Sequence, residues 1–283
     1  MKIKYPNAAL STLLLLICLT FTACGSSDTA NNGESVDNNA DKPLNITIYL
    51  DLSDRITREM QPSQKERDIA IVNKLVQCFK DKCVSDQILR AKNRIKVLFY
   101  PSPNSSEIAT LASALELDMS KLKGKEKRLA LKDIETKFSN SLTQIYDETL
   151  KAHKWVGSDI WGFFSNKKVD DQCIRKDSRN ILVILTDGYL YHINNKQKEG
   201  EAYSYILTQT LNNPNSTLMV KRQGLDNLEV IMLEVNPFDP KIHDKLSSVL
   251  EDWFRGMGVK KFVVSETDLP NNTATVIDNF IAQ

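Results

Sequence analysis

A buried β-strand that runs directly into an acidic loop constrains this 283-residue chain more than any other feature. Residues 45–50 read Asn-Ile-Thr-Ile-Tyr-Leu, rich in β-branched and aromatic side chains, and Asp51 follows at once. The same arrangement recurs at residues 181–185, Ile-Leu-Val-Ile-Leu, which lead to Asp187. Two buried strands that both end in oxygen ligands predict an α/β sheet with a site at its strand tips.

The rest of the chain alternates strand patterns with helix patterns. Further strands are predicted at 94–100, 228–235 and 260–265, with a short edge strand at 115–119. Helices are predicted from the capping box at Ser63 and Glu66 onward, and at about 126–152, 161–164, 201–211, 240–254 and 272–281. Such alternation is typical of a mainly parallel sheet covered on both faces. The predicted fold is a three-layer, doubly wound α/β domain of the Rossmann type over residues 44–283.

The first 23 residues are predicted to be a signal peptide. Lys2 and Lys4 precede an apolar run over residues 8–23, which is shorter than the roughly 20 residues of a membrane span. The run ends in Phe-Thr-Ala-Cys24, which resembles the lipobox of bacterial lipoproteins, with Phe21 where Leu is usual. The resemblance implies lipidation of Cys24 and a protein anchored to a membrane rather than spanning it. The alternative is an ordinary secretory signal with a chance cysteine.

Residues 24–43 are predicted to form a flexible linker. They are mostly Ser, Asp, Asn, Gly and Glu, and cannot bury enough apolar surface to fold. As a random coil such a segment reaches about 25 Å. Asp28-Thr29-Ala30 resembles the short O-glycosylation signal of Bacteroidetes lipoproteins. The expected location is a bacterial cell envelope, on the outer or inner membrane, facing the periplasm or the outside.

The charge balance and the cysteines exclude other classes. Lys and Arg number 37 against 36 Asp and Glu, so the net charge predicts neither a nucleic-acid nor an anionic-membrane partner. Three cysteines follow the lipobox: Cys78, Cys83 and Cys173. A disulfide between Cys78 and Cys83 is possible only if the chain turns between them. The alternative is that all three are free thiols. Without a CxxC or a Cys/His cluster, zinc is unsupported.

Three loops are predicted to meet at the carboxyl ends of strands. They are Asp51-Leu-Ser53-Asp-Arg55, Gly157-Ser158-Asp159-Ile160 and Thr186-Asp187-Gly188. Together they resemble the metal-ion-dependent adhesion site of von Willebrand factor type A domains, and the resemblance covers about residues 44–283. In that family an Asp-x-Ser-x-Ser loop, a Thr and an Asp before Gly surround one divalent cation. The resemblance implies metal ligation by Asp51, Ser53, Ser158 in place of the Thr, and Asp187.

Hydroxyl and carboxylate oxygens of this kind suit Mg²⁺, which takes about six oxygen ligands and keeps several waters. The resemblance implies that an incoming carboxylate completes the coordination. The predicted function is therefore a non-enzymatic binding module that engages an envelope protein or another acidic ligand.

Arg55 departs from the family pattern because it stands at the second Ser, and a guanidinium cannot ligate a metal. Either it points away or pairs with Asp54, leaving a weaker metal site, or its charge replaces the ion and neutralises Asp51 and Asp187. Asp159 and Thr186 adjoin the predicted ligands and are further candidates to modify the site.

Two other functions stay open. One is a metal-assisted hydrolase that uses Asp51, Asp187 and an activated water. The other is a metal-free assembly scaffold within an envelope complex. No Gly-x-Ser-x-Gly, Walker-type or GxGxxG loop is present, so a serine hydrolase and nucleotide binding are not supported. His192 follows Asp187 closely but lacks a second ligand or a carboxylate to orient it.

Overall fold

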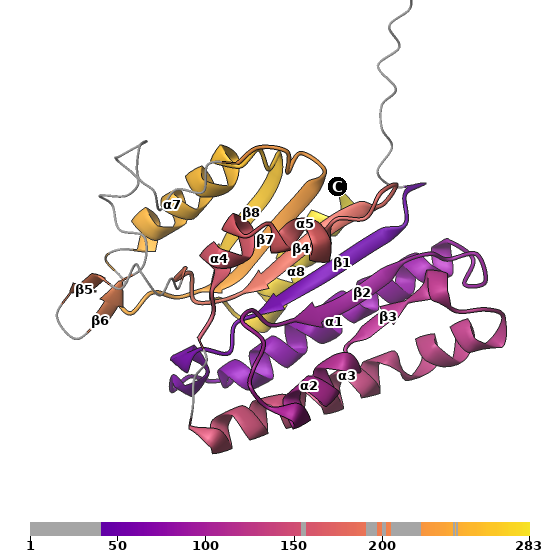
Figure 1. Ribbon diagram of the computed structural model, residues 1–283, viewed down its shortest axis with the longest axis horizontal. Helices are drawn as coiled ribbons and strands as arrows, with labels where there is room; N and C mark the ends of the chain where they lie inside the picture. Colours follow the sequence, from indigo (N-terminus) through magenta and orange to yellow (C-terminus); the bar gives the residue numbers. More distant parts are fainter. Residues whose placement is uncertain are drawn as a thin grey trace, which may run out of the picture. The chain divides into compact units, whose positions relative to one another are not determined.

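Strand β1, Leu44–Leu50, lies inside a six-stranded sheet of order β3-β2-β1-β4-β7-β8 (Figure 1). The other strands are β2 Arg94–Leu98, β3 Glu116–Asp118, β4 Arg179–Leu185, β7 Leu228–Val235 and β8 Lys261–Glu266. All neighbours pair in parallel except β3, which runs antiparallel to β2 at the edge. The predicted mainly parallel α/β fold is confirmed.

The computed structural model describes residues 41–153, 157–190, 197–199, 202–204, 222–239, 241 and 243–283. The predicted signal peptide, lipidated Cys24, most of the linker and His192 lie outside these residues. So does most of the helix expected at 201–211; its described part, Ala202–Ser204, is instead strand β6, paired with β5 Gln197–Glu199. No helix among the described residues is both long enough and apolar enough to span a membrane.

Helices cover both faces of the sheet (Figure 1). One face packs against α1 Gln64–Ser85, α3 Lys125–Ala152 and α8 Pro270–Ala282, with α2 Ser106–Ser113 beside α3. The other packs against α4 Ile160–Ser165, α5 Lys168–Cys173 and α7 His243–Gly256. Short 3₁₀ turns follow β1 and β3: η2 Asp54–Thr57 and η3 Met119–Lys121.

The alternation of side chains along each strand divides the interior into two cores. Ile46 and Ile48 of β1 face the α1 side, whereas Leu182 and Ile184 of β4 face the α4 side, and all four are fully buried. The polar residues of β1 also have a structural reason. Asn45 donates a hydrogen bond from Nδ2 to the Cys173 carbonyl at 2.8 Å, which satisfies an otherwise unpaired carbonyl at the end of α5.

Helix α1 begins as the sequence predicts. Ser63 accepts from the Glu66 backbone N–H, and the Glu66 carboxylate accepts from the Ser63 N–H, which completes the capping box. Ile71 of this helix belongs to the core, whereas Ile69 is only partly buried. The helix continues through Cys78 and Cys83, so the chain does not turn between them, and both are free, as is Cys173.

Both cores lie within one compact unit, residues 38–283. A unit with its own cores and complete sheet is expected to fold without the residues before it. This allows the experiments below to use residues 38–283.

Candidate functional site

The predicted strand-tip loops lie where the strand order reverses. From β1 the chain builds β2 and β3 on one side, and then β4, β7 and β8 on the other, so the loops after β1 and β4 diverge (Figure 1). Ligands of doubly wound sheets bind in the crevice at such a point. Asp51 follows β1 and donates its N–H to the Leu185 carbonyl at 3.0 Å, so the ends of β1 and β4 adjoin.

Asp51 is almost completely buried and both carboxylate oxygens accept hydrogen bonds. Oδ1 accepts from the Ser53 N–H at 2.8 Å, and Oδ2 accepts from the Thr186 hydroxyl at 2.7 Å. Burial raises the pKa of Asp51, and the Arg55 charge opposes that rise. Thr186 is therefore the hydroxyl side chain that joins the loop after β4 to Asp51.

Asp187 pairs with an arginine that the sequence did not single out. Its Oδ2 accepts from Arg58 Nη2 at 2.8 Å. The Arg58 guanidinium also donates to the Asn236 carbonyl and lies 3.9 Å from the ring centre of Phe238. Burial, and then the charge of Asp51, raise the pKa of Asp187 to about 7. Two carboxylates thus share a buried site at which one of them resists ionisation.

Arg55 turns inward, and its side chain is only 1% exposed. Its Nη2 lies 2.6 Å from Asp68 Oδ2, and its Nε donates to the Asp51 carbonyl at 2.9 Å. The same Nε is 3.9 Å from Asp51 Oδ2. Asp54 is exposed, and the ion pairs of Arg55 within the described residues are with Asp51 and Asp68. Arg55 therefore neither points away from the site nor pairs with Asp54; its charge lies beside the carboxylates of Asp51 and Asp68.

The polar network continues into α1 and β7. Asp68 also accepts from the Tyr146 hydroxyl and from Gln64 Nε2, the latter at 2.9 Å. Arg67 binds Glu234 through two hydrogen bonds, of 2.7 and 3.2 Å. The backbone of Glu234 has a φ of 68°, an uncommon conformation for a residue with a side chain. Buried carboxylates and guanidiniums therefore alternate from the strand tips to the first turns of α1.

The two predicted serine ligands are placed differently. Ser53 flanks Asp51 and is partly buried, and its N–H caps the carboxylate. Ser158 is buried on the third loop, where its hydroxyl is 2.9 Å from the Tyr49 hydroxyl. Because Tyr49 donates to the Tyr100 carbonyl, Ser158 is the donor to Tyr49. The neighbouring Asp159 caps α4 through Gly162 N–H at 2.7 Å.

The hydrogen-bond inventory of the site tests the fit of a cation. Each carboxylate oxygen of Asp51 and Asp187 already has a donor, the longest contact being 3.4 Å from the Tyr189 N–H. Among the arginines and carboxylates of this site, the buried side-chain atoms without a partner in the described residues are donors, Arg55 Nη1 and Arg58 Nε. Each carboxylate oxygen keeps a second lone pair, but the positive charges of Arg55 and Arg58 beside the two carboxylates repel a cation, and the unpaired N–H groups require an acceptor. Mg²⁺ stays a prediction from the resemblance, and the residues as arranged do not fit it.

Sequence reasoning missed Arg58, Asp68, Tyr146 and Glu234. Arg58 and Glu234 carry no local signal, because their partners are 129 and 167 positions away. Asp68 does carry one. It precedes Val72 by four residues and therefore lies on the apolar stripe of α1, where a carboxylate needs a buried partner.

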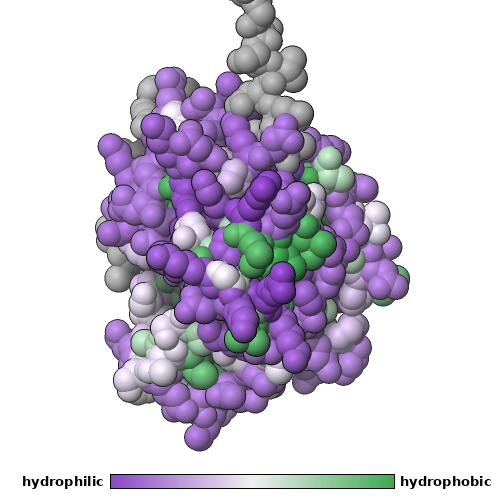
Figure 2. Space-filling model, turned by 90° about the vertical axis from the view of Figure 1, so that its right-hand side faces the viewer, coloured by the Kyte–Doolittle hydropathy of each residue, from purple (hydrophilic) through white to green (hydrophobic). Residues whose placement is uncertain are grey.

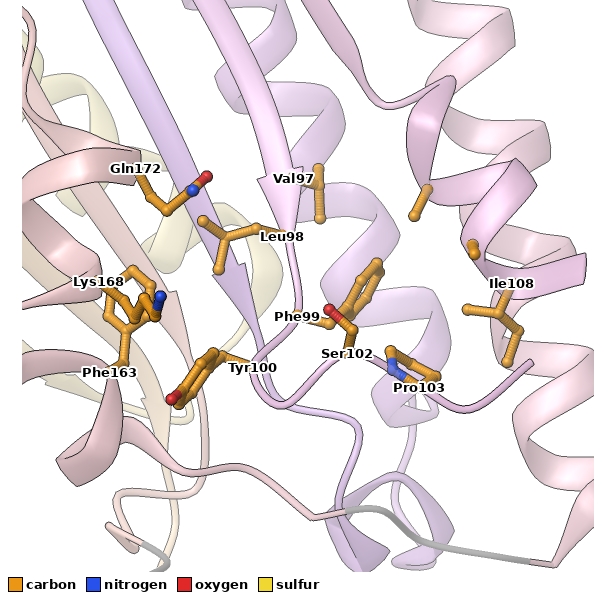
Figure 3. Close-up of a pocket in the computed structure, with 12 residues that line it drawn as sticks. Val97, Leu98, Phe99, Tyr100, Ser102, Pro103, Ile108, Phe163, Lys168 and Gln172 are labelled. Carbon is orange, nitrogen blue, oxygen red and sulfur yellow. The ribbon is translucent and has the colours of Figure 1, made fainter. Parts of the chain in front are cut away.

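Two apolar clefts of about 340 Å³ each flank the turn after β2. In the first, Phe163 and Lys168 lie on one wall and Ile108 on the other, with Leu98 between them (Figure 3). The second is lined in part by Leu50, Leu52 and Gly157, which neighbour the strand-tip residues. Apolar surface is therefore available beside the candidate site.

No family model and no curated protein matches the chain. Among solved structures, an aerotolerance-related membrane protein of Bacteroides fragilis has 11% identity and a TM-score of 0.40, over 84% of this chain and 98% of that one. BatB of Bacteroides thetaiotaomicron has 9% identity and a TM-score of 0.36, over 85% and 100%. The pilus adhesin SpaC of Lactobacillus rhamnosus GG has 9% identity and a TM-score of 0.42, over 85% of this chain and 30% of the adhesin. Such values assign neither a family nor a function.

Proposed function

We propose that this chain is a non-enzymatic binding module of the bacterial cell envelope, tethered by lipid at Cys24, which binds an acidic group of a protein partner at its strand tips. Arg55 and Arg58 supply the positive charge there in place of a metal ion. The observation that carries the proposal is the pair of buried guanidinium N–H groups, Arg55 Nη1 and Arg58 Nε, that lack an acceptor among the described residues.

A buried donor without a partner costs about 1–3 kcal/mol, so an acceptor supplied by a ligand is stabilising. A carboxylate suits this position because hydrogen bonds between guanidinium and carboxylate are charge-assisted. Arg58 is the accessible member of the pair, since its side chain is 16% exposed against 1% for Arg55. We therefore assign first contact with the ligand to Arg58.

The surface around Arg58 favours a protein ligand over a free anion. Phe238 is 63% exposed and stacks on Tyr189 with ring centres 6.3 Å apart. Its backbone N–H donates to the Tyr189 hydroxyl at 3.1 Å, which holds the two rings together. Aromatic side chains at the surface and arginine are residue types that protein interfaces enrich, and here the exposed Phe238 and the half-buried Tyr189 lie beside Arg58.

Magnesium dependence separates this proposal from the adhesion-site mechanism. The measurement is thermal unfolding of residues 38–283 with 10 mM Mg²⁺ or with chelator, and we expect identical midpoints. A bound ion at about a hundred times its dissociation constant would instead add about 2.7 kcal/mol of stability. Magnesium-dependent stabilisation that Asp187→Ala removes would overturn the metal-free site.

Peptide binding tests the arginine directly. The probes are Gly-Phe-Asp-Gly-Gly and its Asn counterpart, titrated calorimetrically. We expect the Asp peptide alone to bind, and Arg58→Gln to weaken it about tenfold or more, because a charge-assisted hydrogen bond contributes about 1.5–3 kcal/mol. Arg255→Gln is the matched control, since Arg255 also lies over a phenylalanine ring, that of Phe262, away from the strand tips. Equal loss in both variants, or cleavage of the peptide, would contradict the proposal.

A further inference from the structure

Three segments meet where the chain enters the sheet, at the end opposite to the strand tips. The Leu44 N–H donates to Asn93 Oδ1 at 2.6 Å, and the Asn93 carbonyl accepts from the Met119 N–H at 2.9 Å. Asn93 Nδ2 donates to Asp86 Oδ2 at 2.8 Å, just beyond the end of α1. The start of β1, the end of α1 and the turn after β3 are thereby held together.

Helix α3 joins this end of the molecule through Lys127. Its Nζ donates to the carbonyls of Leu89 and Ala91, at 3.0 and 2.7 Å, and the residue is buried. The first turn of α3 therefore rests on the connection between α1 and β2. Figure 2 presents this side of the molecule, where a hydrophobic area is surrounded by hydrophilic surface.

Exposed apolar side chains concentrate here. Five large hydrophobic residues are exposed in the described part of the chain, and Val84, Leu89 and Leu129 are three of them, at 60%, 51% and 60%. A single exposed apolar residue needs no explanation, but three such residues on adjoining segments indicate a contact surface.

Basic residues lie on the same segments as these apolar residues. Residues 121–132 contain six Lys or Arg and one Glu, and residues 87–94 contain three and no acid. Six of these are exposed and form no ion pair within the described ranges: Arg90, Lys92, Lys123, Lys125, Arg128 and Lys132. With Val84, Leu89 and Leu129 they define what we call the entry patch. The nearly neutral net charge of the chain conceals this local excess.

The position of these charges on α3 conflicts with the helix dipole. The amino end of a helix favours anions, yet Lys125, Lys127 and Arg128 lie in or next to its first turn, against the single carboxylate of Glu126. Gly124 at the N-cap provides no side-chain hydrogen bond. The Glu126 N–H already donates to the Lys123 carbonyl, so the exposed side chains of Lys125 and Arg128 are the groups that would contact a phosphate. Residue types that locally disfavour the helix are expected at functional sites.

We propose that the entry patch docks on an anionic lipid surface. The entry patch combines exposed apolar residues with lysines and arginines. Surfaces of this composition bind membrane interfaces, where apolar side chains enter the headgroup region and basic side chains contact phosphates. The chain that precedes Leu44 leads to Cys24, so this inference on orientation rests on the proposed lipid tether. Docking at this end turns the strand-tip site away from the membrane and toward a partner.

Vesicle sedimentation of residues 38–283 tests the docking without the lipid. The vesicles are phosphatidylcholine alone, or phosphatidylcholine with phosphatidylglycerol at 7:3. We expect binding to the anionic vesicles only, weakened by salt. Lys125→Glu/Arg128→Glu should lower the partition coefficient about tenfold or more, since each basic residue near the surface contributes roughly a fivefold effect.

Two variants keep the test specific. Lys168→Glu/Lys245→Glu makes the same charge change at exposed residues of α5 and α7 and should change the binding far less. Leu129→Ser keeps the charge and should weaken binding by removing an apolar contact. Three results would overturn the proposal: equal binding with and without phosphatidylglycerol, no binding to the anionic vesicles at low salt, or an equal loss of binding in the control variant. None of these measurements involves Arg58 or Cys24, so the strand-tip proposal is judged separately.

Discussion

Replacing Arg55 with Met should destabilise the domain more than any surface charge change. The substitution keeps an apolar side chain of similar length but removes the guanidinium from Asp68, 2.6 Å away in a site with both side chains 1% exposed. Removing one partner of a buried ion pair costs about 3–5 kcal/mol because the other charge stays buried without compensation. Asp68 retains Tyr146 and Gln64 as donors, so we expect a loss near the lower end, about 3 kcal/mol.

The assay is urea unfolding of residues 38–283, with the slope checked for constancy. A total stability of about 5–15 kcal/mol makes a loss of this size easy to resolve. The double variant Arg55→Met/Asp68→Asn should recover about 2 kcal/mol, because the amide oxygen can accept from Gln64, the amide NH2 can donate to the Tyr146 hydroxyl, and no charge is stranded. Lys80→Met is the control: its Nζ is 2.7 Å from Glu135 Oε1, but the side chains are 26% and 44% exposed, so it should cost 1 kcal/mol or less.

Two results would refute this reasoning. One is a cost below about 1 kcal/mol for Arg55→Met, which would mean that Arg55 is not the buried partner of Asp68. The other is a double variant as unstable as the single one, which would assign the loss to packing rather than to charge.

Three further predictions concern the core, the titration of the site and the anchor. Ile184→Ala should cost about 2–4 kcal/mol in the free energy of unfolding, by lost burial and a cavity, and a loss under about 0.5 kcal/mol would place it at the surface. Because burial and Asp51 raise the pKa of Asp187 to about 7, the folded state retains a proton that the unfolded chain releases near pH 4. Urea stability should therefore fall as pH rises from about 4 to 7, and less so in Asp187→Asn. Cys24→Ser should abolish acyl labelling in cells; label that persists would exclude Cys24 as the acylated residue.

Regular patterns allowed the scaffold to be predicted. The apolar runs of β1 and β4 are long and buried on both faces, and the 3.6-residue period of α3 is unbroken, so local sequence determined these elements. The meeting of Asp51 and Thr186 also followed, because parallel strands bring their carboxyl ends to one edge. The arginine partners did not follow. The path of the chain after η2 decides which charged side chain reaches Asp187, and local sequence does not predict that path. An arginine such as Arg58 would ordinarily be predicted to lie at the solvent-exposed surface.

The pairing of Arg55 with Asp68 also bears on how such a site changes over evolutionary time. A serine at position 55 would restore the hydroxyl of the adhesion-site pattern, yet it would strand the Asp68 carboxylate in the interior. The chain could acquire that pattern only if position 68 changed first or at the same time, since the single step is expected to be strongly destabilising. Positions 55 and 68 are in this sense coupled: the pair can change together, but a change at position 55 alone is expected to be opposed by the loss of stability.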